Sequence, residues 1–116
     1  MWKIVFRQRF VTWLEEQSAD LRRDVYASLS LLREEGPLLS RPYADTLKGS
    51  RLPNLKELRT QHQGHPIRTF FAFDPIRRAI VLCAGDKTGD KRFYEKLIPI
   101  AEDEFLQHIA EMKHEN

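Results

Sequence analysis

The middle of the chain contains the pattern that most limits how this sequence can fold. Three runs of β-favouring residues are separated by short turn-forming segments, and they cover residues 55–61, 66–73 and 78–85. Pro66 has no N–H group to give to a strand ladder, so we expect it to open its strand. Pro75 suits the second position of a type I turn because its φ is already fixed. The pattern predicts a three-stranded antiparallel meander.

The expected register of this meander places two arginines face to face. If residues 62–65 form the first hairpin loop, Gln61 pairs with Pro66 and Arg59 lies directly opposite Arg68. Like charges in that position destabilise a ladder. An anion between the two guanidinium groups would remove the repulsion, and guanidinium groups match phosphate oxygens well. Alternatively, one arginine leans out into solvent, and the residues alone leave both readings open.

Length and composition describe an ordinary globular protein. With 116 residues and a hydrophobic fraction of 41%, the chain is expected to form one domain over residues 1–116. No apolar run approaches the roughly 20 residues that cross a bilayer, and the first residues do not form a signal peptide. The single cysteine, Cys83, excludes an intramolecular disulfide and is expected in the core. A cytoplasmic location with no membrane partner is the natural expectation.

The charges are spread unevenly along the chain. The net charge is only +2, but residues 41–94 contain 11 Lys and Arg against 5 Asp and Glu. This excess indicates a basic face that suits a polyanion such as a nucleic acid. Solvated surfaces often show a similar excess, so the charge pattern alone is weak evidence. The sequence contains no HExxH, CxxC or P-loop motif that would point to another chemistry.

The flanking regions predict helices. An alternating segment at residues 2–6 favours a first strand, and two helices follow, a short one ending near Gln17 and a longer one capped by Ser18. Gly36 followed by Pro37 is a strong signal for the end of the second helix. The expected elements after these are an irregular stretch over 37–53, the meander, a helical start at 92–97 interrupted by Pro99, and a final helix from Pro99.

Together these elements predict a small α+β domain. Two N-terminal helices would pack on one face of a small antiparallel sheet, and the basic side of the sheet would stay open. A C-terminal helix completes the domain. Helices and strands that are segregated along the chain argue against a doubly wound fold.

Several local motifs, taken in order, resemble a known family. They are Arg41–Pro42, Leu47–Lys48–Gly49, Leu58–Arg59, Gly64, Arg68, Phe71–Phe73, Asp74–Pro75, the basic loop Gly85–Asp86–Lys87–Thr88–Gly89, and Phe93–Tyr94. This series resembles the HigB-like branch of the RelE toxins, also called the phage-derived Gp49-like family, and it covers nearly the whole chain. The basic loop followed by Phe-Tyr is the most specific part of the match.

The resemblance implies a RelE-like fold and the toxin of a type II toxin–antitoxin pair. Toxins of this kind are mRNA endonucleases that act on messenger in the ribosomal A site and need no metal or other cofactor. A cognate helix-turn-helix antitoxin of the HigA type silences them and mediates contact with operator DNA.

The resemblance also assigns candidate site residues. The family's two sheet arginines fall on Arg59 and Arg68, its basic residue after the last strand on Lys87, and its C-terminal phenol on Tyr94. Some members carry a lysine where this chain has Glu57. Four further residues are expected to contact RNA or the ribosome, namely Lys48, Lys56, Lys91 and Arg92.

These candidates suit RNA cleavage by the RNA's own 2′-hydroxyl group. The reaction needs charge stabilisation at the phosphate and a proton for the leaving 5′-oxygen. We expect Arg59 and Arg68 to stabilise the phosphate, and Lys87 to assist them or to act as the acid. Tyr94 would deprotonate the 2′-hydroxyl if nearby cations acidify its phenol, or would stack on a base. The rival hypothesis is a non-catalytic RNA- or protein-binding module of phage origin.

Overall fold

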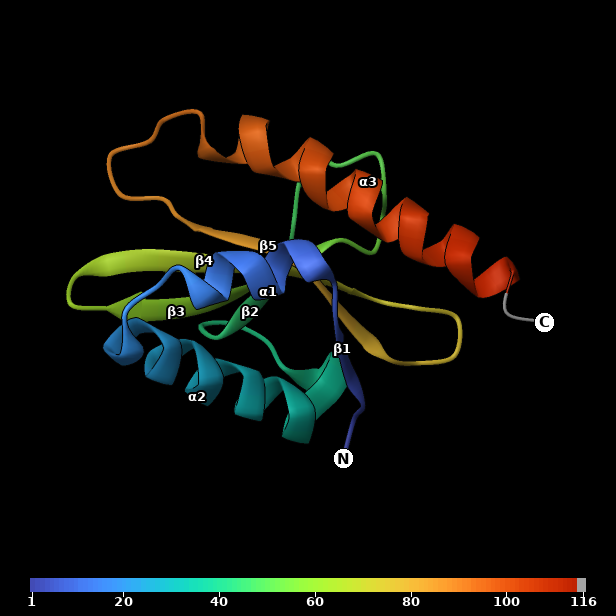
Figure 1. Cartoon of the computed structure of the whole chain (residues 1–116), viewed down its shortest axis with the longest axis horizontal. Helices are drawn as coiled ribbons and strands as arrows, with labels where there is room; N and C mark the ends of the chain where they lie inside the picture. The colour runs from blue at the N-terminus through green and yellow to red at the C-terminus, as the bar shows by residue number, and fades with distance from the viewer. Residues whose placement is uncertain (115–116) are drawn as a thin grey trace.

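The computed structural model describes residues 1–114, which form a five-stranded sheet between two helical layers (Figure 1). Helices α1 and α2 cover one face of the sheet, and α3 covers the other. The strand order is β1-β5-β4-β3-β2. In chain order the elements are β1 Ile4–Phe6, α1 Gln8–Glu15, α2 Ala19–Glu35, the 3-10 turn Gly36–Leu38, β2 Ala44–Thr46, β3 Lys56–His62, β4 His65–Phe73, β5 Ala79–Asp86 and α3 Phe93–Lys113.

The predicted meander is confirmed in its register. Strands β3, β4 and β5 pair antiparallel in sequence, and Arg59 lies opposite Arg68. The first hairpin loop is shorter than predicted, because His62 pairs with His65 and leaves only Gln63 and Gly64 in the turn. Both turn residues have positive φ, 47° and 81°, which suits the twist of a two-residue hairpin.

The sheet is mixed rather than wholly antiparallel, so that part of the prediction is wrong. Strand β1 pairs parallel to β5, with Ile4 beside Ala79 and Phe6 beside Val81. Parallel pairing joins segments far apart in the chain, and a short strand carries no local sign of its direction. Strand β2 lies in the stretch predicted to be irregular, and its three residues are too few to show a period.

The two N-terminal helices pack on one face, as predicted. Ser18 caps α2 by accepting a hydrogen bond from the N–H of Leu21 at 3.2 Å, and Gly36 ends the helix with φ of 56°. A Cβ at residue 36 would come within 2.3 Å of Trp2 Nε1, so only glycine fits there. The apolar residues of this layer are Phe10, Leu14, Leu21, Val25, Leu29, Leu32, Ile67, Phe71 and Val81.

Helix α3 changes the predicted picture of the opposite face. It runs unbroken through Pro99 and covers much of the side that we expected to be open. Apolar residues on both sides of Pro99 pack against the same layer, and this burial offsets the hydrogen bond that proline removes. They include Phe93, Ile98, Ala101 and Phe105, which pack with Phe70, Ile80 and Leu82 of the sheet.

Buried acids tie α3 to the rest of the domain. The β4–β5 turn projects beside the C-terminal half of α3 (Figure 1), where Asp74 Oδ2 lies 3.0 Å from His108 Nε2 and accepts from Arg78. Glu102 accepts from the backbone N–H and Nε of Arg51. These contacts fix the helix against the sheet. Within residues 1–114, no helix combines the length and the apolar character needed to cross a membrane.

Candidate active site

Two adjacent strands bring the paired arginines to the α3 side of the sheet. Arg59 on β3 and Arg68 on β4 share this face with Glu57 and Phe70, which pair with each other one step along the ladder. The side chain of Arg59 is 32% exposed and that of Arg68 only 13%. Neither arginine simply leans out into solvent. The alternative hypothesis, in which one of them does, therefore does not describe the structure.

Glu57 lies between the arginines and balances their repulsion. It is 4% exposed, its Oε2 lies 3.1 Å from Arg59 Nε, and its Oε1 lies 3.8 Å from Arg68 Nε. Asp45 adds a second carboxylate, whose Oδ2 lies 3.5 Å from Arg59 Nη2. The anion expected between the arginines is therefore supplied in part by the protein itself. The sequence placed Glu57 on this face, two residues before Arg59, but gave no sign of this role.

Arg68 has a side-chain donor that no group in the described part of the chain satisfies. Its Nη1 donates to the carbonyl of Ile67 at 3.1 Å, but its buried Nε has no hydrogen-bond partner among residues 1–114. The 3.8 Å separation from Glu57 is too long for a hydrogen bond. Buried polar groups are nearly always satisfied, and exceptions often mark functional positions. A bound anion would supply the missing acceptor.

Tyr94 reaches this site from the first turn of α3. Phe93 packs on Gly85, where a Cβ would stand only 3.0 Å from the ring, so glycine allows the helix to approach closely. The ring of Tyr94 stacks on Phe70 at 6.1 Å between centroids, and its hydroxyl donates to Glu57 Oε1 at 2.7 Å. Four elements therefore converge on one point.

The environment of Tyr94 contradicts the expectation of an acidified phenol. Burial and the hydrogen bond to Glu57 raise the pKa of Tyr94, and the charge of Arg68 only partly opposes this. A phenol of this kind remains protonated and serves as a hydrogen-bond donor. It is poorly suited to act alone as a base.

Lys87 completes the group. The β5–α3 loop is held by a hydrogen bond from the N–H of Lys87 to the carbonyl of Pro66 at 3.0 Å. The Nζ of Lys87 lies 3.5 Å from the hydroxyl of Tyr94 and 5.2 Å from the centre of the Tyr94 ring. The structure thus brings Arg59, Arg68, Lys87 and Tyr94 together, with Glu57 as their common neighbour.

The other four candidates are less closely grouped. Lys48 is exposed and lines a cleft of about 350 Å³ with Tyr94. Lys91 and Arg92 are exposed immediately before α3. Lys56 lies on the opposite face of β3 from Arg59, one residue from Glu57, and its Nζ donates to Thr46 at 3.3 Å. Of the four, only Lys48 shares a cleft with a member of the site, and Lys56 lies on the other face of the sheet.

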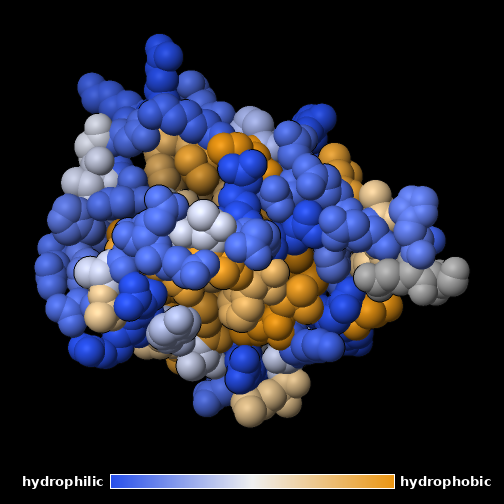
Figure 2. Space-filling view, in the orientation of Figure 1, coloured by the Kyte–Doolittle hydropathy of each residue, from blue (hydrophilic) through white to orange (hydrophobic). Residues whose placement is uncertain are grey.

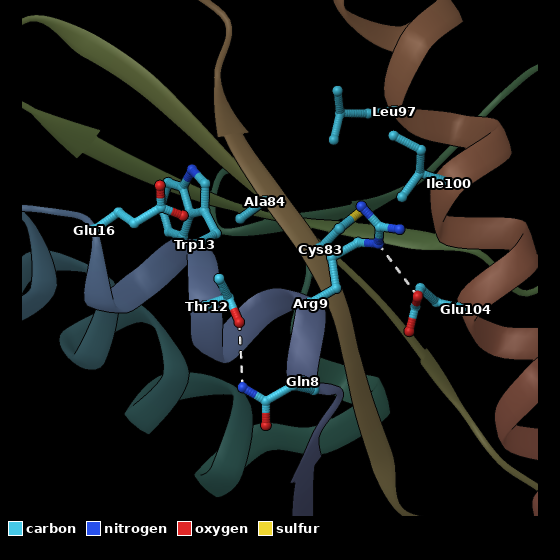
Figure 3. A pocket seen from close by; sticks show the side chains of 10 residues that line it. All are labelled: Gln8, Arg9, Thr12, Trp13, Glu16, Cys83, Ala84, Leu97, Ile100 and Glu104. Carbon is cyan, nitrogen blue, oxygen red and sulfur yellow. Dashed lines mark hydrogen bonds and ion pairs between the residues drawn. The ribbon is translucent and has the colours of Figure 1, made fainter.

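A separate cavity lies between α1 and α3. Figure 2 shows a hollow with apolar walls on this side of the molecule, and Figure 3 shows its lining side chains. The cavity encloses about 530 Å³, and Arg9 and Glu104 form a salt bridge at 3.2 Å across it. Cys83 in its wall is buried as expected, and burial raises the pKa of its thiol to about 12. This thiol is not activated as a nucleophile.

The chain is similar to known proteins over most of its length. Residues 12–106 match the model of the family described as phage derived protein Gp49-like. The chain belongs to this family. It is 41% identical over 108 residues to HigB2 of Mycobacterium tuberculosis and 45% identical over 99 residues to HigB3 of the same organism, both named as candidate toxins. The chain spans 54% of HigB2 and 85% of HigB3, so it is about half as long as the first relative.

Solved structures identify the fold as RelE-like, as the sequence predicted. Isolated E. coli RelE superposes with a TM-score of 0.60 at 14% identity, covering 86% of this chain and 99% of RelE. A chain of the E. coli RelBE toxin–antitoxin complex gives a TM-score of 0.56 at 13% identity, covering 73% of this chain and 95% of that one. The HigB-like relatives and the RelE-like fold together place the chain in the HigB-like branch of this superfamily.

Proposed function

We propose that this chain is the toxin of a type II toxin–antitoxin pair and that it cleaves mRNA in the ribosomal A site. Its relatives named as toxins and its RelE-like fold support the first part. The observation that carries the second is Arg68, whose buried Nε has no hydrogen-bond acceptor among residues 1–114 and lies beside the Tyr94–Glu57 pair. A scissile phosphate is the anion that fits this arrangement.

In the proposed reaction, Arg59 and Arg68 hold the scissile phosphate. The 2′-oxygen of the RNA attacks the phosphorus atom, and the bond to the 5′-oxygen of the next nucleotide breaks. The products are a 2′,3′-cyclic phosphate and a free 5′-hydroxyl. Both arginines stabilise the negative charge that gathers on the phosphate oxygens in the transition state.

Two proton transfers accompany this step. Because Tyr94 donates to Glu57, its oxygen can take the 2′-hydroxyl proton while its own proton passes to the carboxylate. Glu57 is then the final base and Tyr94 the relay. Lys87, 3.5 Å from Tyr94, gives a proton to the leaving 5′-oxygen. The RNA itself supplies the nucleophile, so these side chains account for every proton moved.

The proposed partners follow from the same reading. A helix-turn-helix antitoxin of the HigA type would bind the toxin and carry it to operator DNA. Lys48, which lines the cleft beside Tyr94, and the exposed Lys91 and Arg92, which precede α3, would contact the mRNA or the ribosome. The proposed site of action is the cytoplasm.

One observation favours the rival reading, a non-catalytic binding module of phage origin. Glu57 already neutralises part of the arginine pair, so a phosphate must compete with it. The two readings separate when purified protein is added to ribosomes programmed with a defined mRNA. The proposal predicts cleavage in the A-site codon and a 2′,3′-cyclic phosphate end. RNA binding that weakens with salt, without any new RNA end, would favour the binding module.

A further inference from the structure

A groove lies beside the arginine pair, along the edge of β3 that β2 does not cover. Strand β2 pairs only with Lys56–Leu58, so the last residues of β3 extend beyond it. Helix α2 runs alongside this uncovered edge, and a groove of about 560 Å³ lies between them. Its walls include Asp24, Ser28, Tyr43, Arg59, Thr60 and Arg68. The groove therefore continues directly from the candidate phosphate site.

Tyr43 is fixed next to the arginines and is half exposed. Its carbonyl accepts the N–H of Arg59 at 2.8 Å, which anchors its backbone to the strand that carries the site. The residue is 50% exposed. An aromatic face of this kind can stack on any unpaired base.

The groove also offers an exposed carboxylate for the edge of a base, whereas its Thr60 and Ser28 hydroxyl groups bond to each other. Thr60 Oγ1 donates to Ser28 Oγ at 2.7 Å, and Asp24 Oδ2 lies 2.6 Å from His62 Nδ1. The side chain of Asp24 is 44% exposed, so its carboxylate can accept further hydrogen bonds. A ring face beside hydrogen-bonding groups is the environment that single-stranded RNA recognition uses.

We propose that this groove holds the nucleobase next to the scissile phosphate, stacked on Tyr43 and hydrogen-bonded through its amino group to Asp24. The inference rests on the proposed function, because it assumes that the arginine pair binds an RNA phosphate. An uncovered strand edge can also pair with an extended peptide. The continuity with Arg59 and Arg68 favours RNA, since the base of a bound phosphate must lie within one nucleotide of it.

The chemistry of Asp24 gives the groove a preference. Cytosine presents an amino donor where uracil presents a carbonyl acceptor. A carboxylate accepts a hydrogen bond from the cytosine amino group and repels the uracil carbonyl oxygen. The groove should therefore bind cytosine more tightly than uracil. Asp24→Asn should narrow this difference in affinity, because an amide both donates and accepts hydrogen bonds.

The test measures binding and cleavage separately. The probe is a short oligoribonucleotide with 2′-deoxyribose at the scissile position, varied one base at a time on either side of it. Tyr43→Ala should raise its Kd about tenfold, because base stacking is worth roughly 1–3 kcal/mol. Tyr43→Phe keeps the ring and should bind like the wild type. Tyr26→Ala on α2, 53% exposed and outside the groove, is the matched control.

The outcomes distinguish the groove from the reaction. If Tyr43→Ala has the thermal transition of the wild type and an unchanged Kd for the probe, the groove does not bind the base, even if the wild type cleaves RNA. A Tyr43-dependent Kd in a wild type that does not cleave supports the groove and contradicts the endonuclease. A wild type that does not bind the probe overturns the base-binding groove, whereas the endonuclease is decided separately by cleavage on programmed ribosomes. A defect of Tyr43→Ala confined to antitoxin binding assigns the groove to a peptide instead.

Discussion

The hydroxyl of Tyr94 donates a 2.7 Å hydrogen bond to the buried carboxylate of Glu57, which also lies between Arg59 and Arg68. This contact joins the first turn of α3 to the middle of the sheet. It links the candidate proton relay to the candidate phosphate site in one network.

Tyr94→Phe removes the relay but keeps the ring on Phe70. If Tyr94 passes the 2′-hydroxyl proton to Glu57, cleavage should fall at least about a hundredfold, since acid–base groups contribute roughly 10²–10⁴. RNA affinity should change little. Single-turnover cleavage and equilibrium binding measure the two effects, and Tyr26→Phe is the control. Equal losses of affinity and rate would make Tyr94 a binding residue.

Glu57→Gln keeps the shape of the side chain and removes its charge. RNA should bind more tightly, because the phosphate no longer competes with a carboxylate for the arginines, while cleavage falls about tenfold or more through loss of the base. The pKa of Tyr94 should also fall, because Glu57 raises it in the wild type. Titration of the phenol by NMR measures this shift. Wild-type cleavage in Glu57→Gln would remove the carboxylate from the mechanism.

Lys48 and Lys56 form a matched pair of lysines on different sides of the molecule. Lys48 lines the cleft beside Tyr94, whereas Lys56 lies on the opposite face of β3 from Arg59. Lys48→Ala should weaken binding to RNA or ribosomes and reduce its salt dependence by about one charge. Lys56→Ala should have the smaller effect. The reverse order, measured across a salt series, would contradict the assignment of the basic surface.

Asp74 provides a prediction about stability. Burial alone would raise the pKa of Asp74 above its ordinary value of 3.8, but hydrogen bonds from Arg78 and His108 outweigh it and lower the pKa. Folding therefore stabilises the charged form of Asp74. Its contribution to the free energy of unfolding is complete above pH 3.8 and is lost as the pH falls through the lower native pKa.

Asp74→Asn should accordingly destabilise the domain by about 1.5–3 kcal/mol at pH 7, the range for hydrogen bonds to charged groups. The difference from the wild type should shrink below pH 3.8. Urea unfolding at several pH values measures both. A difference that is constant with pH would show that the loss comes from packing and not from the charge.

Part of this architecture was readable from the sequence because its signals are local. Pro66, Pro75 and the hairpin residues around Gly64 set the register, and the register put Arg59 opposite Arg68. The end of α2 was equally clear, because Gly36 and Pro37 stop a helix by backbone geometry alone.

The rest depended on contacts between distant segments. The parallel pairing of β1 with β5 and the unbroken course of α3 through Pro99 follow from burial against the whole sheet. The role of Glu57 depends on Tyr94, which lies 37 residues away. The one available clue was Gly85, which allows the start of α3 to approach the sheet.

Induction of the wild type and of Arg68→Ala in growing cells, with mapping of new mRNA ends, measures whether Arg68 is needed for mRNA cleavage. Arg23→Ala, an exposed arginine of α2, controls for loss of surface charge. We expect growth arrest and new ends inside coding regions for the wild type and Arg23→Ala, and neither for Arg68→Ala at equal protein level. An Arg68→Ala variant that arrests growth and cuts as the wild type does would contradict this expectation.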